Sequence, residues 1–126
     1  MILDTDVLIW AERGKKSAAD LIDGIDTPYI SLQTYMELIQ LAPSKKRVRL
    51  TQDFLKACGI IVLPLTEAIG HRAAIYIEEL SMETGIRVGD ALIAATAIEH
   101  RFPLVSGNRK HFRNINNLNL VVYRPV

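Results

Sequence analysis

The sequence predicts an α/β fold in which helices surround a central, mostly parallel β-sheet. Short β-branched apolar runs alternate along the chain with segments of helical periodicity, an order that is typical of β-α-β units. No internal repeat, linker or low-complexity segment interrupts the alternation. Because 126 residues is the size of one ordinary domain, we expect a single domain over residues 1–126.

The first half of the chain is expected to contribute two strands and four helices. Residues 2–3 form a very short strand, and the helix that follows ends at Gly14. The other elements of this half are a helix over 15–22, a strand over 28–30, a helix over 31–42 and a helix over 45–58. Ser31 and Ser44 are favourable N-cap residues for the last two helices, and Pro43 separates them.

The second half is expected to contribute three strands and two helices. Residues 60–63 are a continuous apolar, β-branched run, which is typical of a strand buried on both faces. Thr66 opens the longest helix, and Gly85 ends it. A helix over 88–101 is rich in alanine, whose small side chain allows the helix to lie close against a sheet. Strands over 104–105 and 120–123 complete the pattern.

The charges of the chain nearly cancel but are unevenly distributed. Lys and Arg number 15 against 14 Asp and Glu, which gives a formal net charge of +1 and argues against a strongly cationic nucleic-acid binder. However, residues 1–40 carry a net charge of −4 and residues 41–126 carry +5. If a cation neutralised three of the acids, the rest of the surface would be basic.

The chain is expected to be cytoplasmic and not membrane-bound. The single Cys58 excludes an internal disulfide, which fits a reducing compartment. The acidic start at Asp4 is unlike a signal peptide, and no apolar run approaches the roughly 20 residues of a membrane span.

Four acidic side chains are candidates for chemistry. Asp4 and Asp6 directly follow the first strand; either could cap the next helix, but two carboxylates this close repel unless a cation neutralises them. Glu37 has apolar neighbours on both sides within its helix, which favours a half-buried carboxylate over a solvated one. Asp90 heads the alanine-rich helix, where it either caps the helix or points inward toward the sheet edge.

These acids are expected to converge on a metal ion. Ligands bind at the carboxyl ends of the strands in such sheets, which places Asp4, Asp90 and Glu37 near one another. Three hard oxygen ligands without a cysteine cluster favour Mg²⁺ or Mn²⁺ over structural zinc. Such an ion promotes attack of water on a phosphodiester. Ser106 and Asn108 follow a later strand, where turn formation alone could explain them.

At these positions the sequence resembles PIN-domain proteins. The run ILDTDVLI at residues 2–9 is similar to the opening of that family, and Glu37 matches its second acidic position. The run GDALIAATA at residues 89–97 matches the third motif, and SGNRKHF at residues 106–112 resembles the last. Their order, their spacing and the chain length are similar to those of the small VapC-type toxins, over the whole chain.

The resemblance implies a PIN-like three-layer sandwich and an endoribonuclease of a type II toxin–antitoxin pair. RNA would be the substrate, and a cognate antitoxin, a homodimer or a toxin–antitoxin hetero-oligomer would be the expected assemblies. Asp4 and Asp90 would bind Mg²⁺ or Mn²⁺, and Glu37 would be a ligand or hold the metal's water. Thr5, Asp6 and Ser106 would support the centre.

One position departs from the family pattern. Many relatives carry an Asp where this chain has Asn108, which belongs to the predicted catalytic group. Because an amide supplies neither charge nor a base, we expect one firmly held metal in the free protein and a second metal that binds weakly or only with substrate.

Several other side chains are expected to contact the macromolecules. The candidates for RNA-backbone contacts are Arg109, Lys110, His111 and Arg113, and such contacts give affinity without sequence choice. The basic run at residues 45–49 is expected mainly to be a solvated helix face. Trp10 could line a groove for the antitoxin's amphipathic segment, or could simply be core.

Two alternatives to a ribonuclease remain open from the residues. The Asp4-x-Asp6 pair after a strand could be the nucleophile and acid of a phosphatase. Asn108 could instead indicate a non-catalytic interaction module that has kept the fold.

Overall fold

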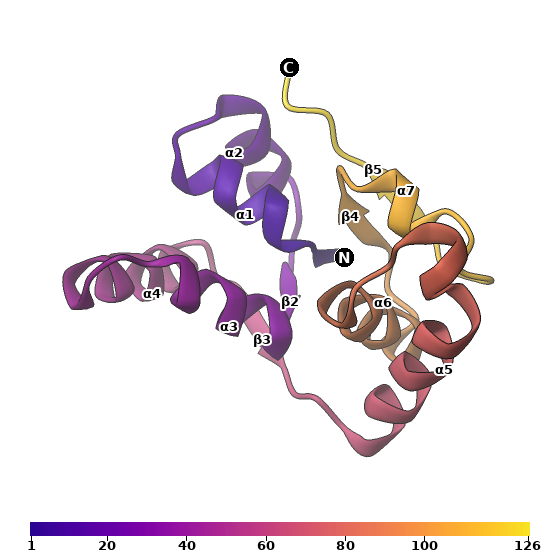
Figure 1. The fold of residues 1–126 in the computed structure, drawn as a ribbon. Helices are drawn as coiled ribbons and strands as arrows, with labels where there is room; N and C mark the ends of the chain where they lie inside the picture. Colours follow the sequence, from indigo (N-terminus) through magenta and orange to yellow (C-terminus); the bar gives the residue numbers. More distant parts are fainter.

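The computed structural model describes residues 1–126, which form five strands and seven helices (Figure 1). The strands are β1 (Ile2–Leu3), β2 (Tyr29–Ser31), β3 (Ile61–Leu63), β4 (Leu104–Ser106) and β5 (Leu120–Val122). The helices are α1 (Thr5–Glu12), α2 (Lys16–Asp23), α3 (Leu32–Leu41), α4 (Lys45–Ala57), α5 (Glu67–Thr84), α6 (Val88–His100) and α7 (Arg109–Phe112).

All five strands form one parallel sheet in the order β3-β2-β1-β4-β5. The central strand β1 pairs with β2 through Ile2 and Tyr29, and with β4 through Ile2 and Leu104. The chain therefore winds from β1 to one edge and then crosses to build the other side. The strand order reverses beside β1. Open α/β sheets bind ligands at such a point, next to the carboxyl ends of the strands.

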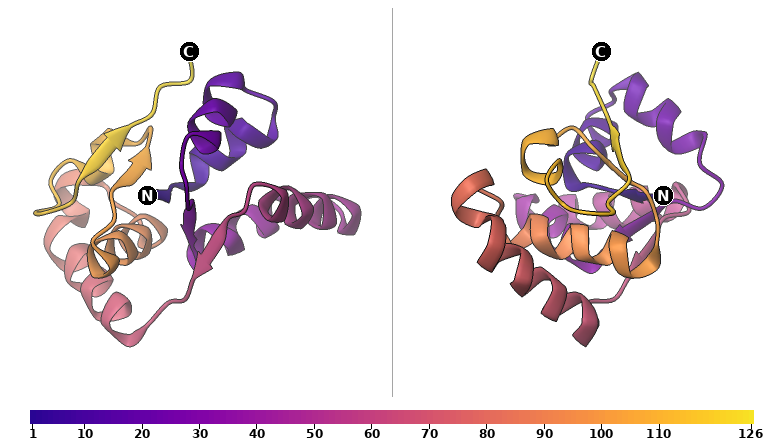
Figure 2. Two further views of the ribbon diagram at one scale, coloured as in Figure 1. Left: turned by 180° about the vertical axis from the view of Figure 1, so that it is seen from behind. Right: turned by 90° about the vertical axis from the view of Figure 1, so that its right-hand side faces the viewer.

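Helices cover both faces of the sheet (Figures 1 and 2). Successive strand residues point to opposite faces, so Ile2 joins the core under α5 and α6, whereas Leu3 joins the core under α1 to α4. Leu104 and Val105 of β4 divide in the same way. The predicted α/β sandwich with a mostly parallel sheet is confirmed.

Local sequence signals explain where the helices begin. Ser31, Ser44 and Thr66 each accept a hydrogen bond from a backbone N–H in the first turn of α3, α4 and α5, as N-cap residues do. Gly85 ends α5 with a φ of 72°, a conformation that glycine adopts without steric cost. The short helix α7 was not predicted, since four residues are too few to display helical periodicity.

The expectation that residues 60–63 are buried on both faces is wrong. Ile61 and Val62 are 47% and 38% exposed, and only Leu63 is buried. The reason is topological, because β3 is an edge strand with a single neighbour. Among the helices, none is both long and apolar enough to cross a membrane.

Candidate active site

Asp4 lies between the end of β1 and the start of α1. Its Oδ1 atom accepts a hydrogen bond from the backbone N–H of Thr5 at 2.7 Å, and its Oδ2 atom accepts one from the hydroxyl of Ser106 at 2.6 Å. The residue is only 5% exposed. Asp4 is thus the N-cap of α1 and also a buried carboxylate at the carboxyl edge of the sheet.

Glu37 approaches the same edge from the middle of α3. The Thr5 hydroxyl donates to Glu37 Oε1 at 3.0 Å, and it lies 3.1 Å from the Thr34 hydroxyl, whose proton it can accept. The other carboxylate oxygen faces the start of α6, where a Cβ atom on Gly89 would lie 3.5 Å from it. The prediction of a half-buried Glu37 is confirmed.

Asp90 is the third residue of α6 and not its N-cap, which is Arg87. The Oδ2 atom of Asp90 accepts from the backbone N–H of Arg87 at 3.3 Å and lies 2.7 Å from Nδ1 of His111. Its side chain is 19% exposed. Asp90 therefore closes the first turn of its helix and still lies at the sheet edge.

Asp6 connects α1 with the loop after β4. Its Oδ2 atom accepts from the backbone N–H of Gly107 at 2.9 Å. Its Oδ1 atom is buried and has no hydrogen-bond partner in the protein. A buried carboxylate oxygen without a donor is costly, so this atom favours a cation nearby.

We expect the Gly107→Ala variant to lower the free energy of unfolding by about 1–3 kcal/mol. A Cβ atom there would lie 2.7 Å from Asp6 Oδ2 and 3.1 Å from the Tyr123 carbonyl oxygen, so the loop must shift. Gly70→Ala on α5 is the control, because nothing lies within 4 Å of its added Cβ, and it should stabilise the helix by about 0.5–1 kcal/mol. Urea unfolding of both variants measures the difference; equal stabilities would contradict the prediction.

The loop after β4 connects these carboxylates with α7. The buried Ser106 donates to Asp4 and accepts from the backbone N–H of Asn108 at 2.9 Å. The side-chain amide of Asn108 lies 2.9 Å from Nδ1 of His111. Ser106 therefore holds both a predicted ligand and the turn that positions Asn108.

His111 does not lie where the sequence analysis expected it. We predicted a phosphate contact, but its side chain is 20% exposed and its ring faces Asp90. The contact joins residues 21 positions apart, and no periodic pattern could reveal it. The other members of the predicted group remain on the surface: Arg109, Lys110 and Arg113 are exposed.

Burial, with a smaller contribution from neighbouring charges, raises the pKa of three of the carboxyl groups. Burial, followed by the charge of Asp6, raises the pKa of Asp4 from 3.8 to about 7, although the bonds from Ser106 and Thr5 oppose the shift. Burial, with a contribution from the charge of Asp90, also raises the pKa of Asp6 and that of Glu37. The site thus concentrates negative charge where water is scarce.

The donor set fits a hard divalent cation. Carboxylates from α1, α3 and α6 meet there, and such oxygen ligands suit Mg²⁺ or Mn²⁺. In this structure no three His, Cys, Asp or Glu side chains are arranged to hold one ion together. Glu37 Oε1 accepts from Thr5 and Asp90 Oδ2 faces His111, so the other oxygen of each carboxylate is left for a ligand.

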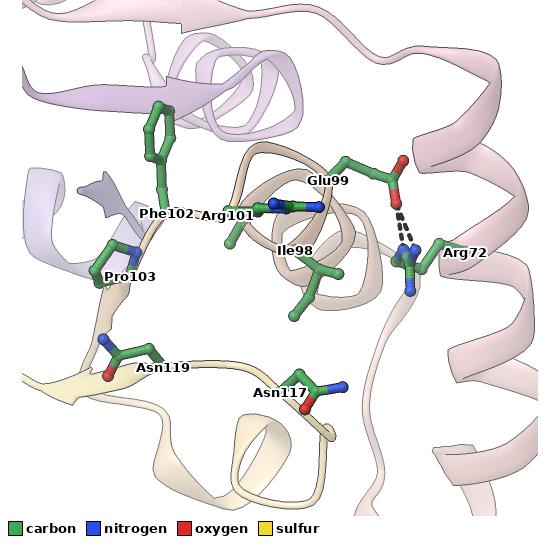
Figure 3. A pocket seen from close by; sticks show the side chains of 9 residues that line it. Arg72, Ile98, Glu99, Arg101, Phe102, Pro103, Asn117 and Asn119 are labelled. Atoms are coloured by element: carbon green, nitrogen blue, oxygen red, sulfur yellow. Dashed lines mark hydrogen bonds and ion pairs between the residues drawn. The ribbon is translucent and has the colours of Figure 1, made fainter.

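A cavity of about 530 Å³ lies away from these carboxylates (Figure 3). It is bordered by Arg72 of α5, the end of α6 and the segments that precede β4 and β5. These segments lie at the amino edge of the sheet. None of the predicted site residues lines the cavity, so it is separate from the candidate active site.

Comparison with known proteins defines the family. The sequence model of the PIN domain matches residues 1–118. The chain therefore belongs to the PIN domain family, and the fold and the converging acids agree with that membership.

Within the family, the resemblance to VapC-type proteins is confirmed. The chain is 29% identical to "Ribonuclease VapC1" of Rickettsia felis, over 96% of this chain and 94% of that protein. It is 26% identical to a chain of a toxin–antitoxin complex from Klebsiella pneumoniae, with a TM-score of 0.80 and coverage of 99% and 98%. It is 25% identical to a chain of VapBC2 from Rickettsia felis bound to a promoter DNA fragment, with a TM-score of 0.79 and 98% of each chain covered.

Proposed function

We propose that the chain is a Mg²⁺- or Mn²⁺-dependent endoribonuclease and the toxin of a type II toxin–antitoxin pair. The observation that carries the proposal is the meeting of Asp4, Asp6, Glu37 and Asp90 at the carboxyl edge of the sheet, where Asp4 is buried with its pKa raised. The name of the Rickettsia felis relative supports RNA as substrate. Because its substrate would be cellular RNA, the proposal places the protein in the cytoplasm.

The proposal gives each residue a role. Asp4, Asp90 and Glu37 hold the metal, which when bound supplies Lewis acidity and a water of lowered pKa. Thr5 and Ser106 fix the orientation of Glu37 and Asp4 through their hydroxyl groups. Asp6 adds negative charge and holds the loop at Gly107. Asn108 lies beside the proposed reaction centre, but its amide carries no charge that would hold a second metal. One firmly held metal is therefore proposed.

Exposed basic side chains on α7 are proposed to bind the RNA backbone. Arg109 and Lys110 lie on that helix, Arg113 follows it, and all three are exposed. This helix also carries His111, which contacts Asp90. Phosphates held by these cations would therefore lie close to the proposed metal site.

Removing one of these cations should weaken RNA binding in a salt-dependent way. We expect Arg109→Ala and Lys110→Ala each to reduce the slope of log K against log salt by about 0.7, the value for one single-strand phosphate contact. Fluorescence anisotropy with a labelled single-stranded RNA measures the slope. Lys46→Ala on α4 is the control, and an equal effect there would contradict a specific role for α7.

An antitoxin segment is proposed to bind between α1, α3 and α4. A cavity of about 180 Å³ lies there, with Ile9, Leu38 and Leu41 among its lining residues. Trp10 does not line it and packs instead against the core under α1 to α4, which is the second of the two expectations for that residue. The Klebsiella pneumoniae structure is a toxin–antitoxin complex, and the Rickettsia felis structure is VapBC2 bound to promoter DNA, which supports a hetero-oligomer. A homodimer remains part of the proposal.

The rival readings have weaker support. The phosphatase reading rests on the Asp4-x-Asp6 pair alone, whereas the ribonuclease is also supported by the name of the Rickettsia felis relative. Failure to trap a phosphoryl-enzyme on Asp4 would favour the ribonuclease. A non-catalytic module would show neither metal binding by calorimetry nor nuclease activity.

Expression of the chain without a partner tests the function. We expect growth arrest and discrete new RNA ends when total RNA is sequenced. The purified chain should cut the same sites with Mg²⁺ or Mn²⁺ and should stop when EDTA is added. Intact RNA under both conditions would contradict the proposal.

A further inference from the structure

The contact between His111 and Asp90 joins α7 to the head of α6. Nδ1 of His111 lies 2.7 Å from Oδ2 of Asp90, and their side chains are only 20% and 19% exposed. The distance is that of a charge-assisted hydrogen bond. Two elements that are distant in sequence are thus connected at the carboxylate that the proposed function uses.

The chemistry of the partners determines which atom donates. An ionised carboxylate can only accept, so Nδ1 of His111 carries the hydrogen and donates it to Asp90. The Nδ2 atom of Asn108 lies 2.9 Å from the same nitrogen; because two donors cannot bond to each other, the amide must be turned so that its carbonyl oxygen faces the Nδ1 hydrogen. The oxygen and nitrogen of an amide are interchanged by a half-turn of the group, so the arrangement needs no backbone movement.

The bond leaves one carboxylate oxygen of Asp90 unoccupied. Oδ2 receives both the Arg87 N–H and the His111 N–H. No hydrogen bond from the protein to Oδ1 is present. Holding one oxygen in this way fixes the plane of the carboxylate, and the second oxygen stays free for a ligand.

We propose that His111 is a positioning residue, which holds Asp90 through Nδ1–H so that its free oxygen serves the metal. This inference rests on the proposed function and deepens it. Hydrogen-bond donors behind a ligating group commonly change metal affinity 10–100-fold when they are removed. Asn108 belongs to the same network, because its side-chain amide lies 2.9 Å from Nδ1 of His111.

Mn²⁺ binding to the purified full chain, measured by calorimetry without RNA, tests the proposal. We expect His111→Phe, which keeps a planar ring but has no donor, to weaken Mn²⁺ binding about 10–100-fold. His111→Asn places an amide N–H near the position of Nδ1 and should restore most of the affinity. His71→Ala is the matched control, because that exposed histidine lies on α5 away from the site, and its Kd should equal that of the wild type.

The outcomes separate this proposal from the ribonuclease assignment. If the wild type binds Mn²⁺ and His111→Phe binds it equally well or more tightly, the positioning role is overturned and the ribonuclease assignment stands. If the wild type binds no Mn²⁺, the proposed function fails, and the positioning role fails with it. A loss of affinity in His111→Phe that His111→Asn does not reverse also overturns the donor role, because packing alone would then explain it.

A nitrogen-detected NMR measurement reports on the same bond without metal. The wild-type spectrum should show a proton on Nδ1 of His111, and Asp90→Ala should remove that preference. A wild-type ring whose only proton is on Nε2 would overturn the proposal even if calorimetry showed a change in Kd.

Discussion

Asp90→Asn is expected to lower RNA cleavage at least about 100-fold while the protein remains folded. The substitution removes a negative charge from the group that is proposed to hold the metal, and metal-based charge stabilisation contributes several kcal/mol to such reactions; each 1.36 kcal/mol is tenfold in rate. The amide keeps an oxygen that can accept from the Arg87 N–H, as Asp90 Oδ2 does. The first turn of α6 should therefore stay closed.

Cleavage of a labelled RNA under single-turnover conditions measures this effect, and thermal unfolding confirms that the variant is folded. Asp53→Asn is the control, because Asp53 is an exposed acid on α4 and should cut like the wild type. If Asp90→Asn cuts as well as the wild type, the position of the active site is wrong.

The elements of the fold could be predicted because their signals are local. The caps at Ser31 and Ser44 and the glycine after α5 act within one turn of their helices. The position of a strand in the sheet is not a local property. Ile61 and Val62 are as apolar as residues of a central strand, but they lie at an edge, and only the path of the chain decides that.

The acidic residues of the site could be predicted, but their contacts could not. Asp4 follows the first strand and Asp90 heads a buried helix, so the parallel topology brings them to one edge. The bond from His111 to Asp90 depends instead on α7, whose four residues give no periodic signal. Gly89 was a usable signal, because a Cβ atom there would lie 3.1 Å from Gln33 Nε2 and 3.5 Å from Glu37 Oε2, which leaves little space for a side chain.

The net charge of +1 is misleading because it combines two different environments. Asp4 is buried, and Glu37 and Asp90 are partly buried, so they contribute to the proposed cation site and little to the surface. Exposed cations such as Arg109 and Lys110 define what RNA would meet on approach. An acidic centre among basic residues is consistent with a metal-dependent enzyme that acts on a polyanion.

Asp4→Asn is expected to remove cleavage and, without metal, to stabilise the protein. Asp4 has a pKa of about 7 in the folded protein against an ordinary value of 3.8, so its charge is unfavourable where it lies. At 1.36 kcal/mol per pKa unit, the neutral amide should raise the free energy of unfolding by up to about 4 kcal/mol at pH 8. An amide can still accept from the Thr5 N–H, and its NH₂ group can donate to the Ser106 hydroxyl, so both present contacts have replacements.

The sign of the pH dependence follows from proton binding. Between about pH 4 and pH 7 the folded protein binds a proton at Asp4 that the unfolded chain has released, because the folded pKa is raised. The metal-free wild type therefore loses stability as the pH rises through this window, and the raised pKa values of Asp6 and Glu37 act in the same direction. The advantage of Asp4→Asn should be small near pH 4 and largest above pH 7.

Urea unfolding in EDTA at several pH values measures this difference, with Asp53→Asn as an exposed control that should change stability by less than about 0.5 kcal/mol. Addition of Mn²⁺ should then reverse the order of stability, because a ligand that binds only the folded state stabilises it, and the variant lacks a carboxylate to bind it. A wild type that is more stable than Asp4→Asn in EDTA at pH 8 would show that hydrogen bonds to the carboxylate outweigh its burial. In that case the charge of Asp4 would stabilise the fold, and it would not be held in place for a cation.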